Sequence, residues 1–151
     1  TCASPAYLAE HGEPKTPDDL REHRLLALTP ASGGSPEWNF PAPYTARHLK
    51  LHFAMRFNAA EGPIVGATAG LGIIHTGDLL VADQVARGEL QLILKDYAMP
   101  GPTVSLVYPS AGHQSPKVRV FSDFAADLMK RFHDIARGWL NPALAADRNE
   151  P

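Results

Sequence analysis

The chain has 151 residues, a length that allows one or two small domains and excludes a large multidomain enzyme. Hydrophobic residues make up 44% and charged residues 20% of the sequence, which is typical of a globular domain and excludes a disordered or membrane-embedded chain. The 14 Lys and Arg residues are scattered among 16 Asp and Glu residues, so the net charge of −2 indicates no basic surface with which this chain alone would bind DNA.

The sequence carries no sign of secretion or of a membrane anchor. Cys2 is the single cysteine, which allows no internal disulfide. No signal peptide and no long apolar span is visible, so we expect a cytoplasmic protein without a membrane partner. The chain begins with Thr1 instead of Met, from which we expect a piece of a longer protein.

The first segments alternate between strand and helix. We expect a short strand over residues 1–4, followed by a helix that Ser4 caps and Gly12 ends. Thr16 is expected to cap a second short helix, after which residues 25–28 form a buried strand.

Two glycine-rich segments resemble nucleotide-binding motifs only superficially. The loop over residues 30–36 contains Gly33 and Gly34 but lacks the lysine of a phosphate-binding loop. Gly70 and Gly72 lack the third glycine of a dinucleotide fingerprint. We therefore expect a surface loop and a helix end at these places, and no nucleotide cofactor.

Residues 45–57 show the alternation of a half-buried strand, with apolar residues expected on one face: Leu49, Leu51, Phe53, Met55 and Phe57. His48 and His52 fall on the opposite face. Four residues apart on a strand they would lie about 13 Å from each other, too far to share a zinc ion. We expect no metal site here.

A helix is expected after this strand, over residues 59–69, because Asn58 with Glu61 forms a variant of the capping box. A short strand at residues 73–74, a helix from Asp78 to Gly88 and a strand over 90–94 follow. This alternation predicts an α/β fold with a central mixed, mainly parallel sheet flanked by helices.

The C-terminal third contains one more strand and one long helix. Residues 104–108 predict a strand, and Ser115 with Pro116 announces a helix. The helix has one broad apolar stripe: Phe121, Phe124, Ala125, Leu128, Phe132 and Ile135. Such a stripe requires a surface to pack against.

Taken together, several segments in order resemble the C-terminal half of LysR-type transcriptional regulators. The resemblance covers roughly residues 1–130 and rests on the shared order and spacing of these segments: Ser4-Pro5-Ala6-Tyr7-Leu8, Gly12, Pro14, Pro17-Asp18-Asp19-Leu20, Trp38-Asn39-Phe40, Arg56-Phe57-Asn58, Ala69-Gly70-Leu71-Gly72-Ile73, Gly88-Glu89-Leu90, Val107-Tyr108-Pro109-Ser110, His113, Ser115-Pro116-Lys117-Val118-Arg119 and Phe121. After Ile73 the sequence departs from the family, where apolar residues and a proline usually follow.

The resemblance implies a two-lobed effector-binding domain similar to periplasmic binding proteins, with a winged helix-turn-helix that this chain does not contain. By the same resemblance, residues 1–102 would form the second lobe. Residues 103–137 would be the strand and helix that return to the first lobe, and residues 138–151 a tail. Most of the first lobe is absent, so we expect the exposed return segment to make the chain dimeric or domain-swapped.

A ligand in such a fold binds beyond the carboxyl ends of the strands. The resemblance places its cleft at the same end, where we expect an effector site formed by five residues: Arg56, Phe57, Asn58, His75 and Thr76. Arg56 offers a planar fork for a carboxylate, which favours an anionic small molecule. The alternatives are that Asn58 only caps a helix, that Arg56 pairs with Glu61, and that His75 is structural.

The function that the resemblance implies is effector sensing by a transcriptional regulator, with DNA bound only through the absent N-terminal domain. A solute-binding protein of the same fold is the alternative. An α/β enzyme is disfavoured because the sequence contains no nucleophile elbow, zinc-protease motif or phosphate loop. We expect neither catalytic residues nor a cofactor.

Overall fold

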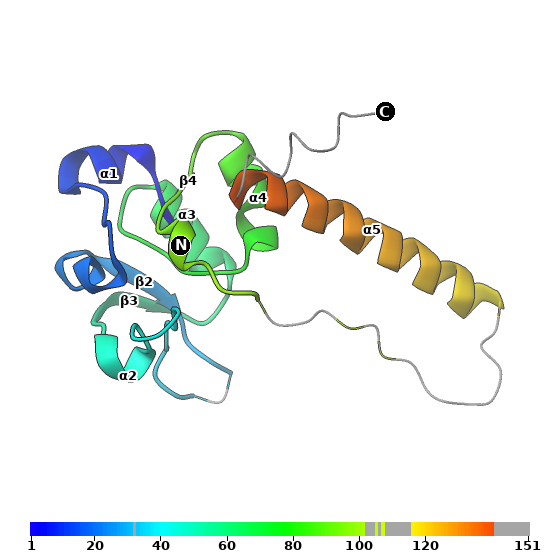
Figure 1. The fold of residues 1–151 in the computed structure, drawn as a ribbon, viewed down its shortest axis with the longest axis horizontal. Helices are drawn as coiled ribbons and strands as arrows, with labels where there is room; N and C mark the ends of the chain where they lie inside the picture. The colour runs from blue at the N-terminus through cyan, green and yellow to red at the C-terminus, as the bar shows by residue number, and fades with distance from the viewer. Residues whose placement is uncertain (32, 102–104, 106, 108–115, 141–151) are drawn as a thin grey trace. The chain divides into compact units, whose positions relative to one another are not determined.

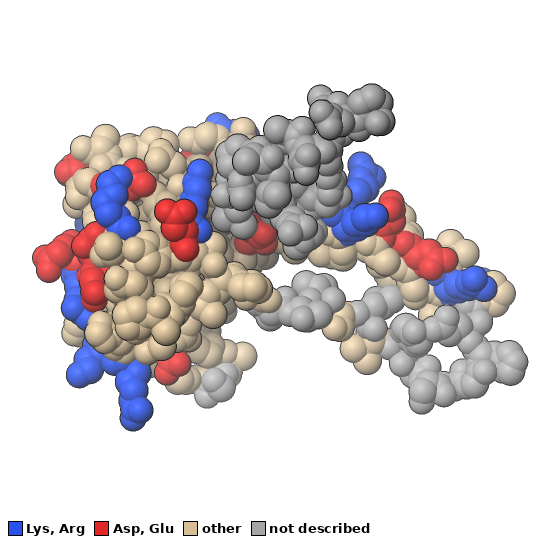
Figure 2. Space-filling model, in the orientation of Figure 1, with Lys and Arg blue, Asp and Glu red and all other residues tan. Residues whose placement is uncertain are grey.

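A computed structural model describes residues 1–31, 33–101, 105, 107 and 116–140, the last nine of these by their backbone alone. The chain divides into two compact units, Thr1–Pro100 and Gly101–Pro151. No helix in the described parts of either unit combines the length and the hydrophobicity needed to span a membrane. Figure 1 shows the elements, and Figure 2 shows acidic and basic side chains intermingled on one face of the first unit.

The first unit alternates short strands and short helices, as the sequence predicts. Ser4 accepts a hydrogen bond from the N–H of Tyr7 and so caps the first helix, which ends at Gly12 with φ 81°. In chain order the elements are β1 (Cys2–Ala3), α1 (Pro5–His11), the 3-10 helix η1 (Pro17–Glu22), β2 (Leu25–Leu28), α2 (Ala46–Leu49), β3 (Phe53–Phe57), α3 (Glu61–Thr68), α4 (Asp78–Ala86), β4 (Gln91–Leu92) and the 3-10 helix η2 (Lys95–Tyr97).

The strands form two two-stranded sheets, which single bridges join into one open, mixed sheet. β2 pairs with β3 in parallel, and β1 pairs with β4 antiparallel. Residues 73–74 connect the two pairs, because Ile73 bridges Leu25 in parallel and Ile74 bridges Cys2 antiparallel. The expected α/β class is confirmed.

Each face of this sheet carries its own apolar cluster. One face includes Leu25 and Ile73, covered by side chains of α1, η1 and the loop that holds Trp38. The other face includes Leu26 and Ile74, which pack with side chains of α3 and α4. Neighbouring residues thus point to opposite faces, as strand geometry requires.

The expectation of a strand over residues 45–57 is wrong for its first half. Residues 46–49 form α2, whose first N–H donates to the side-chain oxygen of Asn39 at 2.9 Å. β3 contains a bulge, because Phe53 and Met55 pair with the consecutive residues Leu25 and Leu26 of β2. Met55 is 38% exposed, although the alternation predicts that it is buried. This bulge places Phe53 and Phe57 in clusters on opposite faces, so they do not share the face that simple alternation predicts.

The strand-spacing argument about His48 and His52 fails with that strand, since His48 belongs to α2. Within the described residues, no three His, Cys, Asp or Glu side chains are placed to hold a metal ion. The strand expected over residues 90–94 is shorter than predicted and covers Gln91–Leu92.

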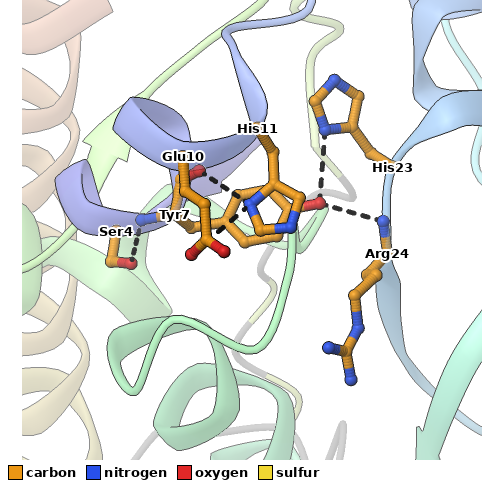
Figure 3. A network of polar contacts seen from close by, with 6 residues as sticks. All are labelled: Ser4, Tyr7, Glu10, His11, His23 and Arg24. Atoms are coloured by element: carbon orange, nitrogen blue, oxygen red, sulfur yellow. Dashed lines mark hydrogen bonds and ion pairs between the residues drawn. The ribbon is translucent and has the colours of Figure 1, made fainter.

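A hydrogen-bonded cluster around Tyr7 fixes α1 to the start of β2 (Figure 3). The Tyr7 hydroxyl accepts the backbone N–H of Arg24 at 3.0 Å and lies 3.2 Å from Nδ1 of His23. The ring of His11 stacks on the Tyr7 ring with centroids 4.3 Å apart. Because Tyr7 is only 1% exposed, its hydroxyl depends on these partners within the protein for its hydrogen bonds.

The second unit contains the predicted long helix, α5 (Pro116–Leu140). The strand expected over residues 104–108 lies mostly outside the described residues, and so do residues 141–151 of the expected tail. Along the first turns of α5, Val120, Phe121 and Phe124 are 70%, 57% and 62% exposed. The second unit therefore presents a large apolar face to solvent.

Candidate functional site

Three chain segments end at one edge of the sheet in the first unit. β2, β3 and residues 73–74 run parallel to one another, with Leu25 paired to both Phe53 and Ile73. The residues that follow them, Thr29, Asn58 and His75, therefore lie beyond the same carboxyl edge. The N–H of Thr29 donates to the carbonyl of Phe57 at 2.7 Å, which holds the ends of β2 and β3 together.

Arg56 is exposed near the end of β3 and makes no ion pair or hydrogen bond with any described residue. The alternative pairing with Glu61 is therefore not formed. The next side chain, Phe57, packs against α3 so closely that a Cβ on Gly62 would collide with its ring. Strand alternation places Arg56 on the opposite face, where its guanidinium is available to an anion.

Asn58 does not cap a helix, so the capping expectation is wrong. α3 begins at Glu61, and its N-cap is Ala60 in a helical conformation without a side-chain hydrogen bond. Asn58 is exposed and forms no hydrogen bond among the described residues. A turn separates the end of β3 from the start of α3. The side-chain amide of Asn58 is therefore available to bind a ligand beside Arg56.

His75 lies at the end of the neighbouring segment in a mostly aromatic environment. Its Nδ1 is 2.8 Å from the hydroxyl of Thr1, and its ring lies 4.8 Å from the ring of Phe40 and 5.5 Å from that of Trp38. Burial lowers the pKa of His75 to about 4. The imidazole is neutral near pH 7, so His75 offers hydrogen bonding and ring packing without a positive charge.

The low pKa of His75 predicts an acid-dependent loss of stability. The folded pKa lies below the ordinary value of 6.5, so the unfolded chain binds the extra proton. The stabilisation is complete above pH 6.5 and declines as the pH falls toward 4, by about 3 kcal/mol. Urea unfolding across this window should show a smaller loss for His75→Gln than for the parent chain. Equal slopes would contradict the assignment.

The structure brings the five expected site residues to one edge, in two groups. Arg56, Phe57 and Asn58 end one segment, and His75 and Thr76 end another, with β2 between them. Two strand spacings put their backbones about 10 Å apart. A small molecule could therefore contact both groups.

Sequence analysis did not assign Trp38 and Phe40 to this region, although their rings enclose His75. The aromatic pair flanking Asn39 was the available signal. Cys2 is buried, and burial raises the pKa of its thiol to about 11, so it stays protonated and is a poor nucleophile.

The comparison with known families is consistent with this geometry. Residues 1–130 match the family described as LysR substrate binding domain. Among curated proteins, the HTH-type transcriptional regulator YhjC of Escherichia coli K12 is 32% identical over 134 residues, which are 88% of this chain and 45% of YhjC. The regulator CrgA of Neisseria meningitidis serogroup B is 30% identical over 83% of this chain and 42% of its own length. The chain thus spans less than half of the curated relatives it matches.

Solved structures give the same result. The regulatory domain of CrgA, described as a LysR-type transcriptional regulator, is 29% identical, with a TM-score of 0.54, over 66% of this chain and 48% of that one. The regulatory domain of AphB from Vibrio vulnificus has a TM-score of 0.60 over 84% of this chain and 62% of its own, at 23% identity. The second likeness supports the fold alone.

Proposed function

The chain belongs to the LysR substrate-binding domain family, and from this membership we propose that it is the effector-sensing part of a LysR-type transcriptional regulator. In the whole protein, a small anionic molecule would bind between two lobes and change the arrangement of subunits. Such coupling requires that the effector bind one arrangement more tightly than the other. DNA would be bound through an N-terminal domain outside this sequence, in the cytoplasm.

The proposed layout assigns residues 1–102 to the second lobe and residues 103–137 to the segment that returns to the first lobe, followed by a tail. Two observations support it. The chain divides by its contacts at Pro100, and its relatives are about twice as long. On this layout the effector contacts in this chain form one wall of the cleft.

One observation carries the proposal: Arg56 and Asn58 are exposed together at the carboxyl edge of the sheet, and no described residue pairs with either side chain. A guanidinium and an amide at this position match a carboxylate and a neighbouring polar group. The hydrogen-bonding groups of His75 and Thr76 lie across β2. We propose that these residues contact the effector, that Phe57 supports them from the opposite face, where its ring packs on α3, and that they bind the effector without catalysing a reaction on it.

The matched experiment compares Arg56→Gln with Lys95→Gln, which removes an exposed charge from η2 instead. Succinate and benzoate, titrated into the chain, should shift the backbone amide NMR signals of residues 56–61 in a saturable way. Loss of the charge-assisted hydrogen bonds should weaken that binding about tenfold or more in Arg56→Gln, with Lys95→Gln unchanged. Absent shifts, or equal affinities in both variants, would refute the assignment of Arg56.

We also propose that the chain self-associates through α5. Val120, Phe121 and Phe124 expose apolar surface whose burial contributes roughly 1.5–3 kcal/mol for each large side chain. A contiguous exposed patch of this kind marks an interface. A second copy of the chain supplies the same face and closes a dimer by twofold symmetry.

Sedimentation tests this association. The parent chain should sediment at twice 16.3 kDa, and replacing Phe121 and Phe124 together with serine should give the monomer. Replacing Asp127 and Lys130 with serine on the same helix is the control and should leave the dimer intact. A parent chain that stays monomeric at high concentration would rule out the proposal.

A further inference from the structure

A second hollow in the first unit lies apart from the effector residues. It is an open cavity of about 500 Å³ beside α2, lined by residues 35–39, 45–47, 50–51 and 53. This volume falls within the range of small-molecule sites. None of the five proposed effector residues lines it.

Two aromatic rings form the apolar side of the cavity. Trp38 is 4% exposed, and its ring meets the ring of Phe53 edge to face with centroids 5.4 Å apart. Because the two rings pack against each other, the apolar wall of the cavity is rigid.

Two cations with no ion-pair partner among the described residues line the polar side, Arg47 and Lys50. Lys and Arg side chains (blue in Figure 2) protrude at the lower left of the view, where Figure 1 draws α2. Glu37 also lines the cavity. The charges therefore favour a ligand with one anionic group and one hydrogen-bond donor.

Both ends of α2 are fixed, so these cations are presented from a rigid element. Asn39 accepts the N–H of Ala46 at one end, and Arg21 donates to the carbonyls of His48 and Leu49 at the other, at 3.2 and 3.0 Å. Lys50 ends the helix at φ 46° and ψ 50°, a left-handed conformation that costs energy in a residue with a side chain.

We propose that this cavity binds an aromatic carboxylate that carries a hydroxyl or ammonium donor. The carboxylate pairs with Arg47 and Lys50, the ring packs on Trp38 and Phe53, and the donor group binds Glu37. The charged residues of this site differ from those of the effector site at the carboxyl edge of the sheet, although Trp38 also packs on His75.

Calorimetric titration of the chain with 4-hydroxybenzoate tests the proposal. The double variant Arg47→Gln with Lys50→Asn removes both charges, and asparagine tolerates the left-handed backbone. We expect the double variant to bind 4-hydroxybenzoate at least about tenfold more weakly than the parent chain, with the affinity of Lys95→Gln unchanged. Benzoate, which lacks the donor, should bind several-fold more weakly than 4-hydroxybenzoate. The indole N–H NMR signal of Trp38 should shift with saturation.

Four results would overturn the proposal. One is the absence of saturable binding in the millimolar range. Another is unchanged affinity in the double variant while its circular dichroism matches the parent chain. The third is inorganic phosphate binding as tightly as 4-hydroxybenzoate, which would show a plain anion site. Weaker binding only in Arg56→Gln would place the ligand at the sheet edge and also exclude this cavity.

Discussion

Replacing Gly72 with alanine is expected to destabilise the chain by about 3 kcal/mol or more, or to prevent folding. A Cβ at this position would collide with the backbone carbonyl oxygen of Arg24. That carbonyl cannot move freely, because it accepts the N–H of Ile73 at 2.8 Å, and the N–H of Arg24 donates to the Tyr7 hydroxyl at 3.0 Å. The alanine must therefore break the contact between β2 and residues 73–74, or strain it.

Gly77→Ala is the matched control, since it adds the same methyl group five residues later. Nothing lies within 4 Å of a Cβ at Gly77, and its φ of −65° suits alanine. Gly77 is the N-cap of α4, so its loss should cost less than about 1 kcal/mol. Urea unfolding followed by circular dichroism compares the two variants. Similar midpoints would show that the close approach to Arg24 does not limit stability.

The parts of the fold that local signals determine agree with the sequence analysis. Ser4 and Pro5 start α1, Pro116 starts α5, and glycine ends α1. Each of these signals acts within one turn of the chain, because a cap or a left-handed residue decides only its own helix end. For this reason they could be predicted without knowledge of the tertiary structure.

The errors arise where tertiary contacts override a local pattern. Residues 45–52 alternate apolar and polar as a strand does, yet Asn39 fixes the first N–H of α2 and selects a helical turn. The bulge in β3 places Phe57 on the face of the sheet that packs against α3. It could not be predicted, because the sequence alternates through the bulge as it would in a regular strand. Asn58 carried a capping signal, but the helix begins three residues later.

The candidate site shows the same division. Arg56 could be predicted from the sequence because it is a polar residue at the end of a strand, and the end of a strand can be recognised from neighbouring residues alone. The enclosure of His75 by Trp38 and Phe40 joins segments more than thirty residues apart, so only the folded chain reveals it. Its effect is chemical as well as structural, since burial lowers the pKa of His75 and leaves Arg56 as the cation of the proposed effector site.

Truncating Leu25 to alanine is expected to cost about 2–5 kcal/mol, because it opens a cavity at the centre of the sheet. Leu25 is fully buried, pairs with Phe53 on one side and Ile73 on the other, and belongs to the apolar cluster that includes Trp38. Its neighbours belong to strands on both sides, so the site cannot collapse by moving a single loop. The loss should therefore fall in the upper part of that range.

Leu28→Ala removes the same atoms from the same strand and is the control. Leu28 is 44% exposed at the carboxyl end of β2, so truncation there forfeits less burial and leaves no enclosed void, for a cost under about 1 kcal/mol. Urea unfolding midpoints measure the difference, with the denaturant slope serving to detect a change in cooperativity. Equal losses in the two variants would contradict a core centred on Leu25.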